Sequence, residues 1–241
     1  MTRKALFIIS FFLVSLLTAC QPNQTLSEGG KLYDKWWVVA ETEAPESAQP
    51  LWATQSTNER SGADTWRCKE CHGWDYLGAD GAYGSGSHYT GFVGVLDAKG
   101  KTEEELVAIL SGETNSDHDF STVLSGADLK TLASFVREGT VDMRPFIVAD
   151  KSVNGDAQKG KRLYDNCVAC HGESGNEMNT EDPNDEPANL SELANDNPWE
   201  VFHKASFGQP GVSNMMAGVT LNWSTEDLVD LLTYLQTLRI E

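Results

Sequence analysis

The sequence predicts an all-α protein built from two tandem units of one fold, and two observations lead to this prediction. A five-residue pattern, Cys-x-x-Cys-His, occurs twice, with its first cysteines, Cys68 and Cys167, 99 residues apart. A helical run downstream recurs at the same spacing, because the segment that starts at Leu124 matches the one that starts at Trp223. Two different features with one common spacing indicate an internal duplication.

The upstream part of the repeat is interrupted. The segment around Leu32 matches the segment around Leu163, but these two residues are 131 positions apart. The first unit therefore has about 32 extra residues before its cysteine pattern. We place this insertion at residues 41–62, where prolines, serines and threonines are typical of a surface loop.

The domain boundaries follow from this alignment. We expect a first domain over residues 30–150, which includes a linker at 139–150, and a second domain over residues 151–241. Capping residues and apolar spacing predict the helices, with Thr102 and Ser224 as N-cap candidates. The predicted helices span residues 31–39, 102–110, 125–138, 156–165, 197–208 and 224–238.

The Cys-x-x-Cys-His pattern is typical of a c-type haem attachment site. Each thiol can form a thioether with a haem vinyl group, and the histidine that follows supplies an axial ligand to the iron. The alternatives are a zinc site, a disulfide and a thioredoxin-like dithiol. Zinc would require both cysteine pairs to converge, and a dithiol needs no adjacent histidine. We therefore expect two covalently bound haem c groups, held by Cys68, Cys71, His72, Cys167, Cys170 and His171.

A helix that ends in this pattern, a middle helix, a loop and a C-terminal helix together resemble the class I cytochrome c fold. The resemblance covers nearly the whole mature chain, as two tandem cytochrome c-like domains. In that family the second axial ligand is usually a methionine in the loop before the last helix. The resemblance implies Met215 as this ligand in the second unit, with Met216 as the alternative because it stands where the family has proline.

The corresponding loop of the first unit has no methionine. His118 occupies a similar position in it and is the expected iron ligand of that unit, with His88 and Met143 as rivals. His88 lies 16 residues after His72, as Pro187 lies after His171. In the family, the proline there is on the proximal side, where its carbonyl accepts a hydrogen bond from the haem histidine, so this register argues against His88.

Several other side chains have a second possible role. Trp36, Trp37 and Trp52 are expected either to cover a haem edge or to pack in the core. His203 is expected at the surface or at a haem edge. Arg67 and Lys69 are expected to be solvated charges, with haem propionates as alternative partners.

Residues 1–19 have the features of a secretory signal peptide. The apolar stretch Ala5–Leu17 is too short to span a membrane. The segment that ends at Cys20 resembles the lipobox of bacterial lipoproteins, which implies lipidation of this cysteine and a polar tether over residues 20–29. We therefore expect an exported, periplasmic protein with a lipid anchor in the cell envelope. The outer membrane is expected because Gln21, and not aspartate, follows the lipidated position.

The formal net charge of −18 and the lack of a basic patch argue against nucleic acid as a partner. The acidic segment 173–186 suggests redox partner proteins with a basic docking surface. The expected function is transfer of single electrons between such partners, without catalysis. The alternatives are a haem enzyme that resembles thiosulfate dehydrogenase, whose active haem has a cysteine distal ligand, and a cytochrome subunit of a larger dehydrogenase or reductase complex.

Overall fold

The computed structural model describes residues 22–177 and 189–238. Over these residues the regular structure is helical, and β-pairing is limited to three isolated bridges, so the all-α prediction is confirmed. The helices are α1 (Pro22–Val39), α2 (Cys68–His72), α3 (Glu103–Leu110), α4 (Gly126–Ser134), α5 (Ala157–Tyr164), α6 (Val168–His171), α7 (Leu190–Asp196), α8 (Pro198–Phe207) and α9 (Thr225–Thr237).

Short helical turns connect these helices. A turn of π-helix, η6 (Phe135–Gly139), continues α4. The 3₁₀ turns are η1 (Pro50–Thr54), η2 (Gly62–Trp66), η3 (Gly86–His88), η4 (Leu96–Gly100), η5 (Ser116–His118) and η7 (Gly218–Leu221).

Three helices begin at capping boxes. The hydroxyl of Thr102 accepts a hydrogen bond from the amide of Glu105 at the start of α3. Ser125 and Ser224 cap α4 and α9 in the same way, each with an aspartate three residues later. These starts agree with the predicted helices, because a capping box depends on residues that are close in sequence.

The N-terminal part of the described chain differs from its prediction. Residues from Pro22 onward are helical and belong to α1, so the expected tether over residues 20–29 is wrong for this stretch. The helix forms here because it packs against other elements. Ser27 is buried and donates a hydrogen bond to the carbonyl of Phe207, at 2.7 Å. A polar sequence next to an expected signal peptide gave no sign of this tertiary contact.

Close helix crossings recur at equivalent positions of the two units. A Cβ on Gly29 would lie 2.5 Å from Cβ of Phe135, and a Cβ on Gly160 would overlap the carbonyl oxygen of Asp230. The first contact joins α1 to the π-turn that continues α4, and the second joins α5 to α9. Both glycines thus allow the opening helix of a unit to approach its final helix closely.

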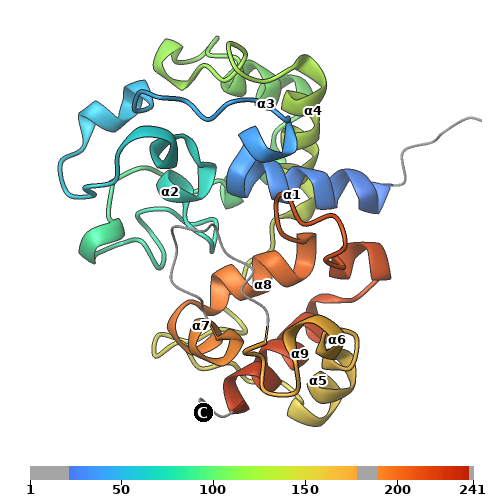
Figure 1. The fold of residues 1–241 in the computed structure, drawn as a ribbon. Helices are drawn as coiled ribbons and strands as arrows, with labels where there is room; N and C mark the ends of the chain where they lie inside the picture. Colours follow the sequence, from blue (N-terminus) through green and yellow to red (C-terminus); the bar gives the residue numbers. More distant parts are fainter. Residues whose placement is uncertain (1–21, 178–188, 239–241) are drawn as a thin grey trace, which may run out of the picture.

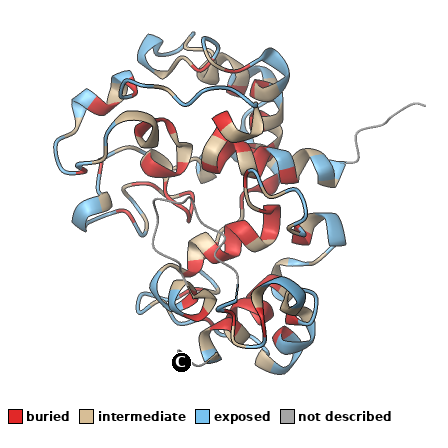
Figure 2. Cartoon of the chain, in the orientation of Figure 1, coloured by how far each residue is buried: buried red, intermediate tan, exposed pale blue. Residues whose placement is uncertain are grey.

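Helix α8 lies between the two units (Figure 1). It packs against α1 of the first unit and against α7 and α9 of the second. The buried apolar residues of both units form one connected cluster. Figure 2 shows buried positions along α1 and α8, which pack against each other, so the units share a buried interface.

Candidate functional site

The first Cys-x-x-Cys-His pattern lies in the wall of a large cavity. Cys68, Cys71 and His72 all line it, and its volume is about 890 Å³. The pattern forms helix α2, which ends at Gly73 with a φ of +76°. This left-handed conformation suits glycine and turns the chain sharply after the histidine. The walls are largely apolar side chains, which include Trp66, Tyr76, Phe92, Leu106, Ile109, Phe120, Leu132 and Val136.

His72 is held in one orientation. Its Nδ1 lies 2.6 Å from the carbonyl oxygen of Val93. Because a carbonyl only accepts, Nδ1 carries the proton and Nε2 has a free lone pair. Burial lowers the pKa of the His72 imidazole to about 4, so the ring is neutral at pH 7, as a metal ligand must be.

His118 lines the same cavity as His72. It stands at the end of η5, and its Nδ1 lies 3.2 Å from the carbonyl oxygen of Ile109, so its Nε2 is also left available. Burial lowers the pKa of this imidazole too. A carbonyl partner on the second ring nitrogen is the usual arrangement of a metal-binding histidine.

The separation of the two rings fits a shared iron. Their centroids are 6.2 Å apart, with an angle of 71° between the ring planes. An imidazole nitrogen binds a metal at about 2 Å and lies roughly 1 Å from its ring centroid, so two imidazoles on opposite sides of one ion have centroids about 6 Å apart. The residues present therefore fit a haem whose iron would be held by His72 and His118.

The rival ligands lie elsewhere. His88 does not line the cavity, and its ring stacks on Tyr83 with a centroid distance of 4.7 Å. Met143 is buried and is also not part of the cavity wall. The residue that accepts the hydrogen bond of His72 is Val93 and not His88, so the proximal register taken from Pro187 is wrong for the first unit.

The tryptophans that were expected to cover a haem edge do not line the first cavity. Trp36, Trp37 and Trp52 are buried, but none of them lines the first cavity. Trp66 does, and its indole nitrogen donates a hydrogen bond to the carbonyl of Ser47, at 2.8 Å. The core-packing alternative is therefore the better description of the first three tryptophans.

The second Cys-x-x-Cys-His pattern lines a smaller cavity of about 120 Å³. Cys167, Cys170 and His171 form one side of it, and burial lowers the pKa of the His171 imidazole. Both Met215 and Met216 line the same cavity. Met216 is 44% exposed, whereas Met215 is partly buried, which favours Met215 as the residue turned inward. Pro187 and most of the acidic segment lie outside the described residues.

The environment of the cysteines differs from that of a redox-active dithiol. Burial raises the pKa of the Cys68 thiol to about 12 and that of Cys167 to about 11. Reactive Cys-x-x-Cys thiols have a lowered pKa instead. The two cysteine pairs also line separate cavities, so they do not converge on one zinc ion.

Comparison with known proteins bears on the second unit. Residues 157–239 match the family model for cytochrome c. The match supports a c-type cytochrome, and a cytochrome c domain implies covalently bound c-type haem with an electron-transfer role. The search of curated proteins found no match to the chain.

The first unit repeats contacts of the cytochrome c domain. The hydroxyl of Tyr164 donates to the carbonyl of Gly172, and the hydroxyl of Tyr33 donates to the carbonyl of Gly73, both at 2.7 Å. Each tyrosine also contacts an aromatic ring of the final helical segment of its unit, at 5.4 Å between centroids in both cases. The opening helix, the Cys-x-x-Cys-His pattern and the final helix are thus joined by the same interactions twice.

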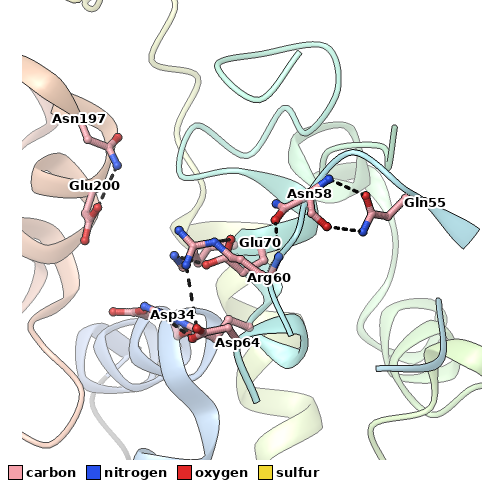
Figure 3. Close-up of polar contacts among 10 residues, drawn as sticks. Asp34, Gln55, Asn58, Arg60, Asp64, Glu70, Asn197 and Glu200 are labelled. Carbon is pink, nitrogen blue, oxygen red and sulfur yellow. Dashed lines mark hydrogen bonds and ion pairs between the residues drawn. The ribbon is translucent and has the colours of Figure 1, made fainter. Parts of the chain in front are cut away.

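A cluster of charged side chains lies at helix α2, and Figure 3 shows Asp34, Arg60 and Glu70 of this cluster. The guanidinium of Arg67 pairs with the carboxylate of Asp34, and its Nε donates to the carbonyl of Asp34 at 2.9 Å. Glu70 is fully buried between Arg60, at 2.9 Å, and Lys69. Arg67 and Lys69 are therefore not solvated charges, and the sequence-based expectation is wrong, because tertiary packing brings Asp34 to Arg67 and buries Lys69 together with its neighbour Glu70.

Helix α8 extends this cluster across the interface. Lys204 pairs with Glu200, at 2.8 Å. Its ammonium lies 5.9 Å from the ring centroid of Trp74, and the ammonium of Lys69 lies 5.1 Å from the same ring. Trp74 is buried two residues after the first iron-binding histidine candidate, so cations of both units contact one aromatic ring.

His203 lies at the centre of the interface and is fully buried. The expectation of a surface position is wrong, because α8 is covered by the first unit.

Several partners of the candidate ligands had no signal in the sequence. The carbonyls of Val93 and Ile109 are main-chain acceptors that any residue type could supply.

Among the described residues, no helix is both long enough and apolar enough to cross a bilayer. Cys20 and residues 1–19 lie outside the described part of the chain, so the lipidation prediction has no structural counterpart here.

Proposed function

We propose that this protein is a lipid-anchored dihaem c-type cytochrome that passes single electrons between redox partners in the bacterial periplasm. The observation that carries the proposal is the pair His72 and His118. Both rings line the first cavity with their centroids 6.2 Å apart, and each has its Nδ1 on a main-chain carbonyl. The cytochrome c match over residues 157–239 supports the second site.

Each cavity would hold one haem through its own residues. Cys68 and Cys71 would form the thioethers of the first haem, and His72 and His118 would be its axial ligands. Cys167, Cys170 and His171 would bind the second haem, with Met215 as its distal ligand. Bound haem c supplies the one-electron ferric–ferrous couple.

Two protein ligands on each iron favour a carrier over an enzyme. An enzyme that uses one haem for catalysis needs an axial position that a substrate can reach. A distal cysteine of the thiosulfate dehydrogenase type has no counterpart, because four of the five cysteines belong to the attachment patterns and the fifth is Cys20. A role as the cytochrome subunit of a larger complex uses the same chemistry and differs only in the partner.

The location and the partner are proposed from the sequence. Export matches the covalent attachment of haem, and Cys20 would hold the protein at the outer membrane through its lipid. The net charge of −18 favours a partner with a basic docking surface, and their association would slow as salt screens the attraction.

Carbon monoxide binding to the reduced protein tests the proposal. A carrier with two six-coordinate irons binds little carbon monoxide, and the His118→Ala variant binds it at the first haem only. His88→Ala is the matched control, because this histidine lies outside the cavity wall. Strong binding by the unmodified protein would favour an enzyme, and an effect of His88→Ala without one of His118→Ala would mean that the ligand is misassigned.

A further inference from the structure

The insertion of the first unit lies against the cavity that holds the candidate iron ligands. Gln49 and Leu51 both line this cavity, together with His118. The second unit has no corresponding segment, since its chain runs from Tyr164 at the end of α5 to Cys167 without an intervening loop. The insertion is thus placed to act on the first site alone.

The side chain of Gln49 connects the insertion to the turn that carries His118. Gln49 is 4% exposed, and its Nε2 donates a hydrogen bond to the main-chain carbonyl of Asp117, at 2.6 Å. Asp117 is the residue immediately before His118 in η5. A buried amide donor that loses its acceptor is costly, so this bond holds the main chain next to His118 in place.

Gln49 is itself fixed from two further sides. Its Oε1 accepts a hydrogen bond from the amide of Leu51, at 2.6 Å, which caps η1. The main-chain amide of Gln49 donates to the hydroxyl of Thr65, at 2.8 Å, and Thr65 lies three residues before Cys68. The side chain and the main-chain amide of Gln49 therefore tie together η1, the His118 turn and the segment that leads into the first attachment pattern.

The His118 turn is fixed on its C-terminal side, where the main-chain amide of the buried Phe120 donates to the carbonyl of Leu110, but its N-terminal side has little such support. Residues 113–117 are exposed, and η5 is a single turn of three residues. The Asn115 side chain caps it, but this bond is local and exposed. An exposed loop without a buried attachment opens readily, which would let a distal ligand leave the iron.

We infer that Gln49 is a positioning residue for the distal ligand of the first haem, and that the insertion 41–62 is a strap that keeps His118 on the iron. The inference rests on the proposed function, in which His118 is that ligand. It adds that the first iron resists external ligands because of the strap and that the second, which lacks one, depends on its methionine loop alone.

The test compares two glutamine-to-glutamate substitutions in the same insertion. Gln49→Glu keeps the oxygen that caps η1 but cannot donate to Asp117. Gln55→Glu is the matched control, because Gln55 makes the same kinds of side-chain-to-backbone bond to Thr57 and Asn58, within the insertion and away from His118. Gln49→Met is a second variant that removes the donor without adding charge.

The readouts are the rate of carbon monoxide binding to the reduced full-length protein and the low-spin ferric electron paramagnetic resonance signal of the first haem. We expect about a tenfold faster rate at the first haem in both Gln49 variants, the change that loss of one such bond produces, with a weakened low-spin signal. Gln55→Glu and the second haem should match the unmodified protein.

Two outcomes separate the inference from the proposed function. If His118→Ala increases carbon monoxide binding but neither Gln49 variant does, the strap is wrong and the ligand assignment stands. If His118→Ala itself has no effect, the ligand assignment is wrong, and the positioning role falls with it.

Discussion

The hydroxyl of Tyr76 donates a hydrogen bond to Nδ1 of His203, at 2.7 Å. The direction follows from the other ring nitrogen, because Nε2 lies 2.9 Å from the carbonyl oxygen of Gly30 and must donate to it. Tyr76 lines the first cavity, and Lys204 and Ala205, which follow His203 on α8, line the second. One imidazole therefore joins the wall of the first cavity to the helix whose next residues line the second.

This histidine should make stability depend on pH. Burial lowers the pKa of His203 to about 4, from an ordinary value of 6.5. The unfolded chain therefore binds a proton between these values that the folded protein does not bind. The free energy of unfolding should fall as pH falls from 6.5 to 4, by at most about 1.4 kcal/mol per pH unit from this group.

Urea unfolding at pH 7 and pH 5 checks this prediction, with His203→Gln as the reference without a titrating ring. The variant should be less stable at pH 7 by about 1–3 kcal/mol, because Tyr76 loses its partner. The difference between the two proteins should shrink at pH 5. An equal difference at both values would contradict the prediction.

The ion pair of Asp34 and Arg67 should be strongly coupled to folding. Burial alone would raise the pKa of Asp34, but the neighbouring Arg67 guanidinium lowers this pKa to about 2. The carboxylate therefore stabilises the fold above pH 4, and this contribution is lost as pH falls toward 2. Asp34→Asn should cost about 3 kcal/mol, since it leaves a buried cation without its counter-charge. The equivalent Asp165 of the second unit is exposed, and Asp165→Asn should change the free energy of unfolding by less than about 0.5 kcal/mol in the same urea titration.

What could be predicted from the sequence was mostly local. The capping boxes at Thr102, Ser125 and Ser224 depend on residues three apart, and the predicted helices there are confirmed. The roles of His203 and Lys69 could not be predicted in this way. Each is a polar residue that a sequence assigns to the surface. His203 is buried because the first unit covers α8, and Lys69 is buried beside Trp74 and Glu70.

The candidate site shows the same limit. The position of His118 opposite His72 was expected from the repeat, and the structure brings the two rings together. The hydrogen-bond acceptor of His72 was expected near His88 from the second unit, but the first unit uses Val93. Loop lengths differ between the units, and a backbone acceptor carries no side-chain signature.

The glycine at the α5–α9 crossing should tolerate no side chain. A Cβ at Gly160 would overlap the Asp230 carbonyl, which is backbone and cannot move aside easily. Gly160→Ala should reduce the free energy of unfolding by about 1–3 kcal/mol. Gly126→Ala is the control, because no atom lies within 4 Å of its added Cβ and alanine should stabilise α4 by up to about 1 kcal/mol. Thermal unfolding of both variants should therefore shift in opposite directions.

The anchor prediction concerns Cys20. Replacing this cysteine by serine removes the only expected lipid attachment point, so the Cys20→Ser protein should appear in the soluble fraction after cell lysis. Immunoblots of membrane and soluble fractions check this. A Ser variant that stays with the membrane as fully as the unmodified protein, while a non-lipidated control is soluble, would mean that another part of the chain holds it there.

The two proposed haems should differ in reduction potential, with the first lower than the second. Methionine ligation favours ferrous iron more than imidazole does, so a histidine–methionine pair raises the potential and a histidine–histidine pair leaves it lower. Electrons that enter at the first site would then pass downhill to the second.

The acidic residues Glu173 and Glu177 lie close after His171 and should oppose this difference in potential, because negative charge stabilises the ferric state. Both are exposed, and solvent and salt screen exposed charges, so the ligand effect should dominate. A spectroscopic redox titration that resolves the two haems, repeated with Met215→His, decides the point. The variant should bring the second midpoint down toward the first, and equal midpoints in the unmodified protein would exclude the proposed direction of electron flow.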